Sequence, residues 1–427
     1  MIVLVVLGAL LVLALLTLVH WYLWRRLVRD VSAPGGRWRR TGTVLAVVLP
    51  LLSVGALVGG RAFPIAVERW FAWPGYLWLA VLLYLLLALA VGELVRPLLL
   101  RLPSRAARAA RAGAAVPKES GADVPTSDES AADGPGVNGP ATPATPAAPA
   151  APSPERRLFV ARAVAIGASG AAAAVVGTGM YGVLRGPRLK QVTVPLAKLP
   201  AAAHGYRIAV VSDIHLGPIL GRAHTQRIVD TINAAKPDLI TIVGDLVDGT
   251  VPELGRDAEP LAQLRARDGA YFVTGNHEYF SGAAPWVDFV RELGVHPLQN
   301  ARVELGGFDL AGVNDIAGER EGDGPDFGRA LGDRDPARTA VLLSHQPVTI
   351  HDAVRHGVDL QLSGHTHGGQ LWPGNFVAEL ANPTVAGLER YGDTQLYVTR
   401  GAGAWGPPVR VGAPSDITVV TLASLRA

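Results

Sequence analysis

Ser363-Gly364-His365-Thr366-His367-Gly368-Gly369-Gln370 is the stretch from which the fold of this chain can be inferred. Two histidines stand two residues apart, with glycines on both sides. On a regular strand, side chains two residues apart share one face of the sheet. Glycine accepts positive φ and close approach, so a turn here can direct both imidazoles to one place. Because imidazole is the commonest neutral metal ligand, the stretch predicts a metal site with further ligands elsewhere.

Those further ligands are expected at the ends of strands. Runs rich in β-branched and other apolar residues recur at 207–212, 238–243, 270–274, 340–343 and 359–362. Helical patterns lie between several of them, at 225–235 and 286–293, and this alternation predicts an α/β sheet. Open α/β sheets place their sites at the carboxyl ends of the strands. The motifs found there are Asp213-Ile214-His215, Gly244-Asp245-Leu246-Val247-Asp248, Gly275-Asn276-His277-Glu278 and Ser344-His345-Gln346-Pro347.

As a set, these motifs resemble those of the calcineurin-like metallophosphoesterases. A single buried histidine is usually structural, but here five of the 11 histidines fall at strand ends together with two aspartates. The resemblance is closest to the bacterial membrane-associated branch, in which the last motif reads Gly-His-Thr-His-Gly-Gly-Gln, and it covers about 199–422. It implies a four-layer α/β/β/α sandwich with two metal ions between the sheets, and an enzyme that hydrolyses phosphoric esters.

The resemblance also implies the ligand set, residue by residue. Asp213, His215 and His367 would hold one metal ion, and Asn276, His345 and His365 the other, with Asp245 bridging both. Oxygen and nitrogen donors without sulfur suit Mn²⁺, Fe or Zn²⁺, and the chain has no cysteine. Two such ions can clamp the attacking and leaving oxygens of an in-line displacement and lower the pKa of bound water towards ~7. A metal-bridging hydroxide is therefore the expected nucleophile.

Two further residues match catalytic positions of the family. His277 is similar to the histidine that faces the leaving-group oxygen, as a general acid or as a stabiliser of transition-state charge. Asp248 matches the carboxylate that orients it. In the phosphoprotein-phosphatase branch this Asp is followed by Arg-Gly, whereas Gly249 and Thr250 follow it here. The missing phosphate-binding arginine argues against phosphoprotein substrates.

Other residues near the motifs leave two interpretations open. Glu278 and Tyr279 either line the pocket or have structural roles. Trp372 follows the central glycines, and Trp405 lies in a loop rich in Gly and Pro. Each of these tryptophans either contacts lipid or substrate or simply covers the sheet.

The first half of the chain is read as a membrane region. Hydrophobic residues make up 49% of the chain and charged residues only 18%, and the apolar excess precedes residue 184. Apolar runs at 1–19, 41–60 and 77–91 approach the roughly 20 residues needed to cross a bilayer. A short loop is expected at 61–75, between the second and third runs. We therefore predict a region with three transmembrane helices at 1–111.

Two further segments lead to the last domain. A Pro- and Ala-rich stretch at 112–155 has no apolar period and is predicted to be a disordered linker. The segment 156–185 is predicted to be a fourth transmembrane helix or, because Arg156-Arg157 precedes Phe159, a twin-arginine-like signal anchor. The metallophosphoesterase domain is expected at 190–427.

The distribution of arginines predicts the orientation. They follow the first and third apolar runs, which the positive-inside rule places in the cytoplasm. The fourth span then puts the last domain on the extracytoplasmic face of the cell membrane. The arginines concerned are Arg25, Arg26, Arg29, Arg37, Arg39, Arg40, Arg96, Arg101, Arg105, Arg108 and Arg111.

These observations predict a membrane-anchored, dinuclear metal-dependent phosphoesterase. Phospholipids or lipid-linked envelope precursors are the expected substrates, because the anchor holds the site at the membrane, and membrane lipid is the expected partner. A formal net charge of +3 gives no reason to expect nucleic acid. Two alternatives remain open: a non-catalytic, metal-stabilised binding or receptor module, and a nucleotide phosphodiesterase inside the cell.

Overall fold

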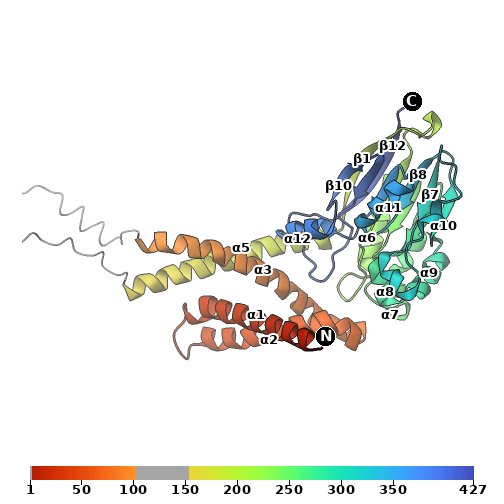
Figure 1. The fold of residues 1–427 in the computed structure, drawn as a ribbon. Coiled ribbons are helices and arrows are strands. Elements are labelled where there is room, and N and C mark those ends of the chain that lie inside the picture. Colours follow the sequence, from red (N-terminus) through yellow and green to blue (C-terminus); the bar gives the residue numbers. More distant parts are fainter. Residues whose placement is uncertain (1, 102–152) are drawn as a thin grey trace, which may run out of the picture.

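The computed structural model describes residues 2–101 and 153–427, so most of the predicted linker and the arginines at 105, 108 and 111 lie outside the described residues. The described chain forms an arm of long helices joined to an α/β domain at one end (Figure 1). This division agrees with the apolar first half and the strand-rich second half of the sequence.

The domain contains two six-stranded mixed sheets. The first runs in the order β1 (Arg188–Leu196), β12 (Asp416–Ser424), β2 (Arg207–Val211), β3 (Leu239–Val243), β4 (Ala270–Val273) and β5 (His296–Pro297). The second runs in the order β10 (Gly387–Tyr391), β11 (Thr394–Val398), β9 (Leu360–Ser363), β8 (Thr339–Leu343), β7 (Phe308–Gly312) and β6 (Ala301–Glu304). Strands β2 to β5 are parallel to one another, as are β7, β8, β9 and β11.

Alternation along the strands gives the domain its layers. On β2, Ile208 and Val210 belong to a core cluster between the two sheets, whereas Ala209 and Val211 belong to the cluster on the outer face. Successive strand residues point to opposite faces, so a strand that is apolar throughout is buried on both. The result is the predicted four-layer α/β/β/α sandwich.

Short helices cover the outer face of each sheet. The first sheet is covered by α6 (Arg222–Ala235), α7 (Val251–Ala258) and α9 (Ala283–Glu292). The second is covered by α10 (Phe327–Leu331) and α11 (Ile350–Arg355). Two more helices lie near the strand ends, α8 (Asn276–Ser281) and α12 (Gly374–Ala381).

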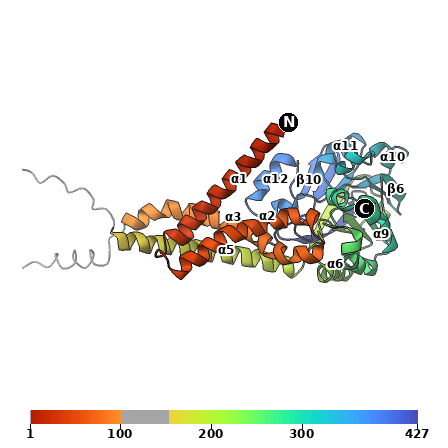
Figure 2. The ribbon, with the colours of Figure 1, turned by 90° about the horizontal axis from the view of Figure 1, so that it is seen from below.

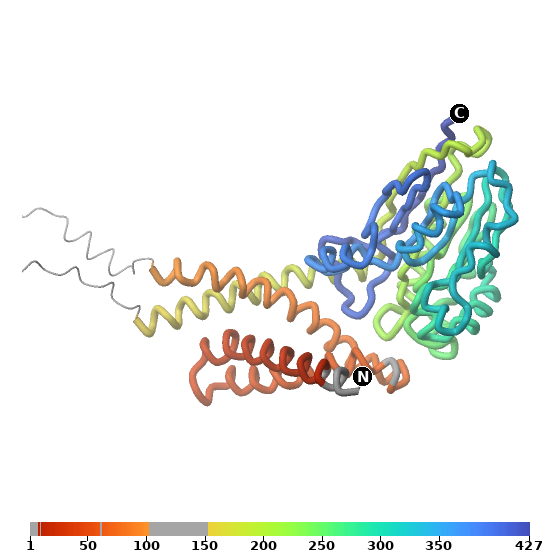
Figure 3. Tube along the Cα trace, viewed as in Figure 1, coloured from red at the N-terminus to blue at the C-terminus, as the bar shows by residue number. Residues whose placement is uncertain are grey.

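The arm consists of α1 (Ile2–Trp24), α2 (Arg37–Ala62), α3 (Ile65–Arg101) and α5 (Pro154–Leu184). Each of these four described helices contains a segment long and apolar enough to cross a membrane. Helices α3 and α5 run side by side (Figure 3), and α1 leans away from the others towards its start (Figure 2). Many leucines of α1 and α2 are exposed, as expected for helices that face lipid.

The segment between the second and third apolar runs differs from the prediction. A loop was expected at 61–75, but α3 already begins at Ile65, and the break is confined to Phe63 and Pro64. The cause is tertiary packing. Ile65 is buried in the outer core of the α/β domain, and its backbone N–H donates to Glu253 Oε1 at 3.4 Å. Arg69 pairs with Asp257 at 3.5 Å, so the first turns of α3 are docked on the domain.

A second contact joins the arm to the domain further along α3. The hydroxyl of Tyr84 donates to the carbonyl oxygen of Trp372 at 2.9 Å. Val409, from a late loop of the domain, is buried in the apolar cluster formed mainly by α3 and α5. The arm and the domain are therefore packed against each other at both the α2–α3 turn and the middle of α3.

Candidate metal centre

The predicted ligands sit in turns that directly follow the strands. Asp213 follows β2, Asp245 follows β3, and His345 follows β8. Asn276 begins α8 after β4, and His365 follows β9. Because β2, β3 and β4 are parallel neighbours, and β8 and β9 are too, these turns lie at one edge of the sandwich.

The turns bend through backbone conformations that most residues avoid. Positive φ is found at Asp213, His215, Asp245, His365 and His367, which are five of the eight such non-glycine residues in the described chain. Gly368 and Gly369 take positive φ, as the sequence suggested, and both histidines of the central motif do so too. Gly364 contributes by close approach instead, because a Cβ there would lie 2.5 Å from Asp213 Oδ2.

One cluster contains Asp213, His215 and His367. His367 Nε2 lies 3.3 Å from Asp213 Oδ1 and 3.0 Å from His215 Nε2. All three residues are buried. These are the three side chains that the resemblance assigned to one metal ion, and their ligating atoms lie within 4.8 Å of one another.

A second cluster contains Asp245, His345 and His365, again within 4.8 Å. His345 Nε2 lies 3.2 Å from Asp245 Oδ2. Asn276 Oδ1 lies 3.0 Å from His365 Nδ1, which brings the predicted amide ligand to the same place. Asp245 also lies 3.7 Å from His215 Nε2, so it stands between the two clusters.

The hydrogen bonds of the histidines fit a metal site. His345 Nδ1 lies 2.8 Å from the carbonyl oxygen of Val243 and must donate to it. In the neutral ring, Nε2 then carries the lone pair, and this atom is buried without a hydrogen-bond partner among the described residues. His215 Nδ1 likewise contacts Asp248 at 2.8 Å, which leaves its Nε2 aimed at the cluster. A divalent cation such as Mn²⁺ or Zn²⁺ binds a neutral imidazole through one nitrogen while the other donates a hydrogen bond, and both rings have this arrangement.

The electrostatics of the site also call for added positive charge. Burial, reinforced by the charge of His345, lowers the pKa of His365 to about 4, so this ring is neutral at pH 7. Burial opposes protonation of His345, yet the nearby charges of Asp245 and Asp213 raise its pKa well above the ordinary value. The buried carboxylates thus draw a proton onto His345, and a bound cation would supply the same charge.

His277 lies beside the clusters and is held by Asp248. Its Nδ1 is 2.7 Å from Asp248 Oδ1, and its Nε2 is 4.0 Å from Asp245 Oδ2. Burial disfavours the imidazolium, but the hydrogen bond and charge of Asp248, with Asp245, raise the pKa of His277 to about 9. The rings of Phe280 and Trp405 meet it edge-on at 5.6 and 5.9 Å. A pKa in this range favours the protonated form of the His277 ring at neutral pH.

Glu278 has a role that the sequence left open. It is fully buried, and its carboxylate accepts from the backbone N–H groups of Asp245 (3.0 Å), Leu246 (2.7 Å) and Gly275 (2.5 Å). Burial and the charge of Asp245 raise the pKa of Glu278 to about 7. Glu278 thus ties the turn after β3 to the turn after β4, and so positions Asp245.

Arg410 is a residue that the sequence analysis missed. Its buried guanidinium donates to the carbonyl oxygens of His367 at 3.0 Å and Gly403 at 2.7 Å, and its Nη2 lies 3.0 Å from His367 Nδ1. It therefore fixes the ring of His367 from behind. No motif surrounds Arg410, and its distance of 43 residues along the chain from His367 gives no sequence signal.

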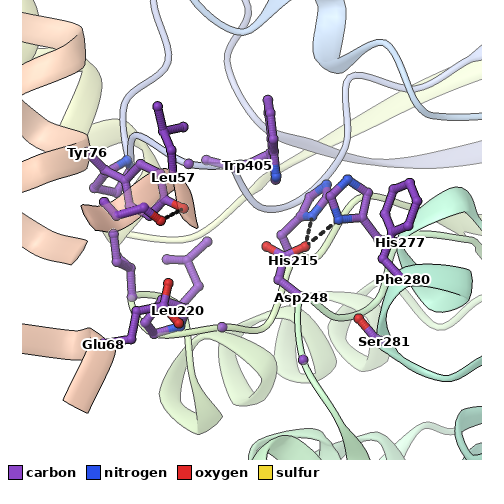
Figure 4. A pocket seen from close by; sticks show the side chains of 18 of the residues that line it. Leu57, Glu68, Tyr76, His215, Leu220, Asp248, His277, Phe280, Ser281 and Trp405 are labelled. Carbon is purple, nitrogen blue, oxygen red and sulfur yellow. Dashed lines mark hydrogen bonds and ion pairs between the residues drawn. The ribbon is translucent and has the colours of Figure 1, made fainter. Parts of the chain in front are cut away.

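A pocket of about 340 Å³ opens beside His215, Asp248 and His277. Its far wall comes from the arm rather than from the domain: Leu57 of α2, and Glu68 and Tyr76 of α3, lie across from His277 (Figure 4). Trp405 and Phe280 also line it. Trp405, for which the sequence left open a contact with lipid or substrate or a place on the sheet, therefore borders this pocket.

Comparisons with known proteins agree with this architecture. The family model of the calcineurin-like phosphoesterases matches residues 206–369. A protein of Danio rerio named "Transmembrane protein with metallophosphoesterase domain" is 38% identical over 258 residues, covering 57% of this chain and 59% of that one. A metallophosphoesterase of Helicobacter pylori strain J99 is 38% identical over 247 residues, covering 57% and 66%.

A shorter relative is matched over most of its length. A metallophosphoesterase of Aquifex aeolicus is 35% identical over 240 residues, covering 55% of this chain and 91% of that one. By contrast, this chain spans about six tenths of the length of the Danio rerio and Helicobacter pylori relatives. The strand-end motifs, the two-sheet sandwich and these matches lead to one conclusion: the chain belongs to the calcineurin-like metallophosphoesterase family.

Proposed function

We propose that this chain is a membrane-anchored hydrolase of phosphoesters that uses two divalent cations. The observation that carries the proposal is the position of Asp245 between two clusters of ligands. Asp213, His215 and His367 would hold one ion, and Asn276, His345 and His365 the other, with Asp245 shared. Mn²⁺, Fe or Zn²⁺ suit these nitrogen and oxygen donors.

When bound, the two ions would acidify a water molecule and neutralise charge on the phosphoryl group. The chain's own residues supply the rest. The Nδ1–H group of His277 donates a hydrogen bond to Asp248, and Nε2–H faces the pocket, where it can protonate the leaving oxygen as the bond from phosphorus to that oxygen breaks. Water contributes hydroxyl to phosphorus, and the products are a phosphate or phosphomonoester and an alcohol.

The substrate class is proposed from the position of the pocket. Its wall includes Leu57 and Tyr76 of the apolar arm, and four described helices can cross a membrane. A site built partly from membrane helices favours phospholipids or lipid-linked envelope precursors over soluble nucleotides. We place the arm in the cell membrane as a multi-pass anchor, with the domain at 190–427 on the extracytoplasmic face.

The experiment is a phosphoester panel on the full chain in lipid nanodiscs, with Mn²⁺ added. Bis-p-nitrophenyl phosphate, p-nitrophenyl phosphate, a phospholipid and a cyclic nucleotide are offered to the wild type and to His277→Ala. We expect phosphoester hydrolysis that prefers the lipid and falls by 10²–10⁴-fold in His277→Ala, while bound metal is retained. Absence of hydrolysis in the metal-loaded wild type would sink the proposal. A preference for the nucleotide would remove only its lipid part.

A further inference from the structure

The wall that α3 gives to the pocket contains an unpaired acid. Glu68 is only 3% exposed and lines the same pocket as Asp248 and His277. Within the described parts of the chain, no hydrogen bond or ion pair reaches its carboxylate. The polar groups next to it in sequence are engaged elsewhere, because the Ile65 N–H donates to Glu253 and Arg69 pairs with Asp257. Its side chain is mostly buried and lines the pocket, so the carboxylate can interact with a ligand that enters the pocket.

The rest of the pocket indicates the charge of that ligand. Besides its histidines, the charged residues that line it are Glu68, Asp248 and Glu253, and no lysine or arginine is among its described lining residues. Asp248 is engaged by His215 and His277, and Glu253 accepts from Thr250. Glu68 is left to interact with whatever enters. A pocket wall with this charge repels anions and attracts a cation.

His277 indicates which part of the substrate meets Glu68. Under the proposed function His277 faces the leaving oxygen, and it shares the pocket with Glu68, which lies across from it (Figure 4). The leaving alcohol therefore extends from His277 towards the α2–α3 wall. We propose that Glu68 binds a positively charged ammonium group on the leaving alcohol of a phosphodiester substrate. Ethanolamine is the smallest alcohol of this kind, and this inference rests on the proposed function.

The test compares an ammonium alcohol with a neutral one on the full chain in nanodiscs. Glycerophosphoethanolamine is paired with glycerophosphoglycerol, and phosphatidylethanolamine with phosphatidylglycerol, so that soluble and lipid sources of the group are separated. We expect the wild type to favour ethanolamine in at least one pair. Glu68→Gln should lower the ratio of kcat/KM values about tenfold, mainly through KM. Glu292→Gln, on the exposed face of α9, should leave the ratio as in the wild type.

A binding measurement separates the role of Glu68 from the proposed function. Calorimetry with ethanolamine alone should show binding to the wild type and about tenfold weaker binding to Glu68→Gln. If the wild type hydrolyses both members of a pair and Glu68→Gln leaves their ratio unchanged, the role of Glu68 is refuted while the proposed function stands. If no phosphodiester is hydrolysed and ethanolamine does not bind, both fail.

A different surface supports a second inference. Helix α12 has no buried residue, and its large apolar side chains are exposed: Phe376 by 57%, Val377 by 68% and Leu380 by 87%. Trp372, just before it, is 49% exposed. Exposed apolar side chains gathered on one short helix mark a docking surface.

The position of this helix identifies what docks there. Trp372 accepts a hydrogen bond from Tyr84, near the middle of α3, and Figure 1 shows α12 where the domain meets the arm. Glu93 of α3 pairs with Arg26 at 2.7 Å and marks the charged end of the arm, away from the domain. Along a helix, Tyr84 is only ~14 Å from Glu93. The hydrocarbon core of a bilayer is ~30 Å thick, so Trp372 lies at a level that the bilayer reaches.

We infer that α12 enters the bilayer from the domain side, with Phe376, Val377 and Leu380 among the acyl chains. A short helix with an exposed apolar face next to membrane spans behaves in this way. The same segment follows directly after the motif that contains His367, so the pocket is held close to the lipid surface.

The absence of cysteine from the chain makes this inference easy to test. A nitroxide label on Leu380→Cys is compared with one on Glu292→Cys in nanodiscs by power-saturation electron paramagnetic resonance. We expect position 380 to be more accessible to oxygen and less accessible to a water-soluble nickel chelate than position 292. Equal accessibility at both positions would place α12 in water. Protection of position 380 from both reagents would indicate a protein partner or a second copy, and either result overturns the inference.

Discussion

Asp248 connects the two functional halves of the site, because one carboxylate contacts both His215 and His277. Through His215 it orients a candidate metal ligand, and through His277 it holds the proposed proton donor. Its own pKa is lowered to about 2, since the charges and hydrogen bonds of the two histidines outweigh its burial. Asp248 is therefore ionised throughout the neutral range, and its negative charge favours the imidazolium of His277.

Replacing Asp248 with Asn should shift the pH profile of hydrolysis. The raised pKa of His277, about 9, keeps the ring protonated below that pH, and activity should fall as pH rises through it. Loss of the adjacent negative charge lowers the pKa of His277, so the alkaline limb of kcat should move to lower pH by about 1–2 units. The profile is measured with a phosphodiester substrate at saturating Mn²⁺. An unmoved alkaline limb would show that His277 is not the titrating acid.

Glu278 gives a second prediction for a single residue. The Glu278→Gln variant keeps the volume of the side chain. Its amide has only one oxygen that can accept hydrogen bonds, whereas the carboxylate of Glu278 accepts from three backbone N–H groups. Unsatisfied buried donors cost about 1–3 kcal/mol, so the thermal midpoint of the domain should fall by about 2–12 °C. Glu292→Gln, on an exposed helix face, serves as the control. A midpoint equal to that of the control would contradict the role assigned to Glu278.

At the scale of secondary-structure elements, the sequence predicted what local patterns determine. Apolar β-branched runs gave β2, β3, β4, β8 and β9, and the polar residues after them gave the candidate ligands. These features could be predicted because parallel strands bring their carboxyl ends to one edge. The short loop expected at 61–75 could not be predicted correctly, because the helical first turns of α3 depend on the docking of Ile65 in a core formed by distant residues.

Contacts between elements far apart in sequence were the least predictable. Arg410 reaches His367 from a loop with no motif, and Glu68 enters the pocket from a helix that composition marks only as apolar. Neither position has a periodicity or a neighbouring residue that would single it out. Only the packing of the arm on the domain brings these residues to the site.

That packing can be tested at Ile65. Ile65→Ala removes a side chain buried in the domain core and close to Gly249, and should weaken the docking of α3 by about 2–4 kcal/mol. Hydrogen exchange should become faster in the first turns of α3 and in the segment around Gly249. Val67→Ala changes an exposed side chain in the same turn and should have little effect. Equal exchange rates in the two variants would mean that the Ile65 contact does not hold the start of α3 on the domain.

At the scale of the whole molecule, the arm and the domain form one arrangement in which two candidate membrane helices, α2 and α3, line the pocket beside His277. Charged residues such as Arg26 and Glu93 gather at the end of the arm opposite the domain. In the proposed orientation that end lies in the cytoplasm, and the domain and the α2–α3 turn lie together on the other side of the membrane.

This orientation is tested by cysteine labelling in intact cells, because the chain has no cysteine of its own. A membrane-impermeant maleimide should label Leu425→Cys, in the exposed end of the domain, and should label Ala33→Cys, in the α1–α2 turn, only after the cells are opened. Labelling of Ala33→Cys in intact cells, with Leu425→Cys protected, would reverse the proposed topology.

The most direct test of the central claim is the number of metal ions bound per chain. Inductively coupled plasma mass spectrometry on the purified full chain should find two divalent ions. His345→Ala and His367→Ala should each retain about one, because each removes a ligand from one cluster only, and Asp245→Ala should retain less than one. A wild-type chain that binds a single ion, or a His367→Ala variant that still binds two, would contradict the account.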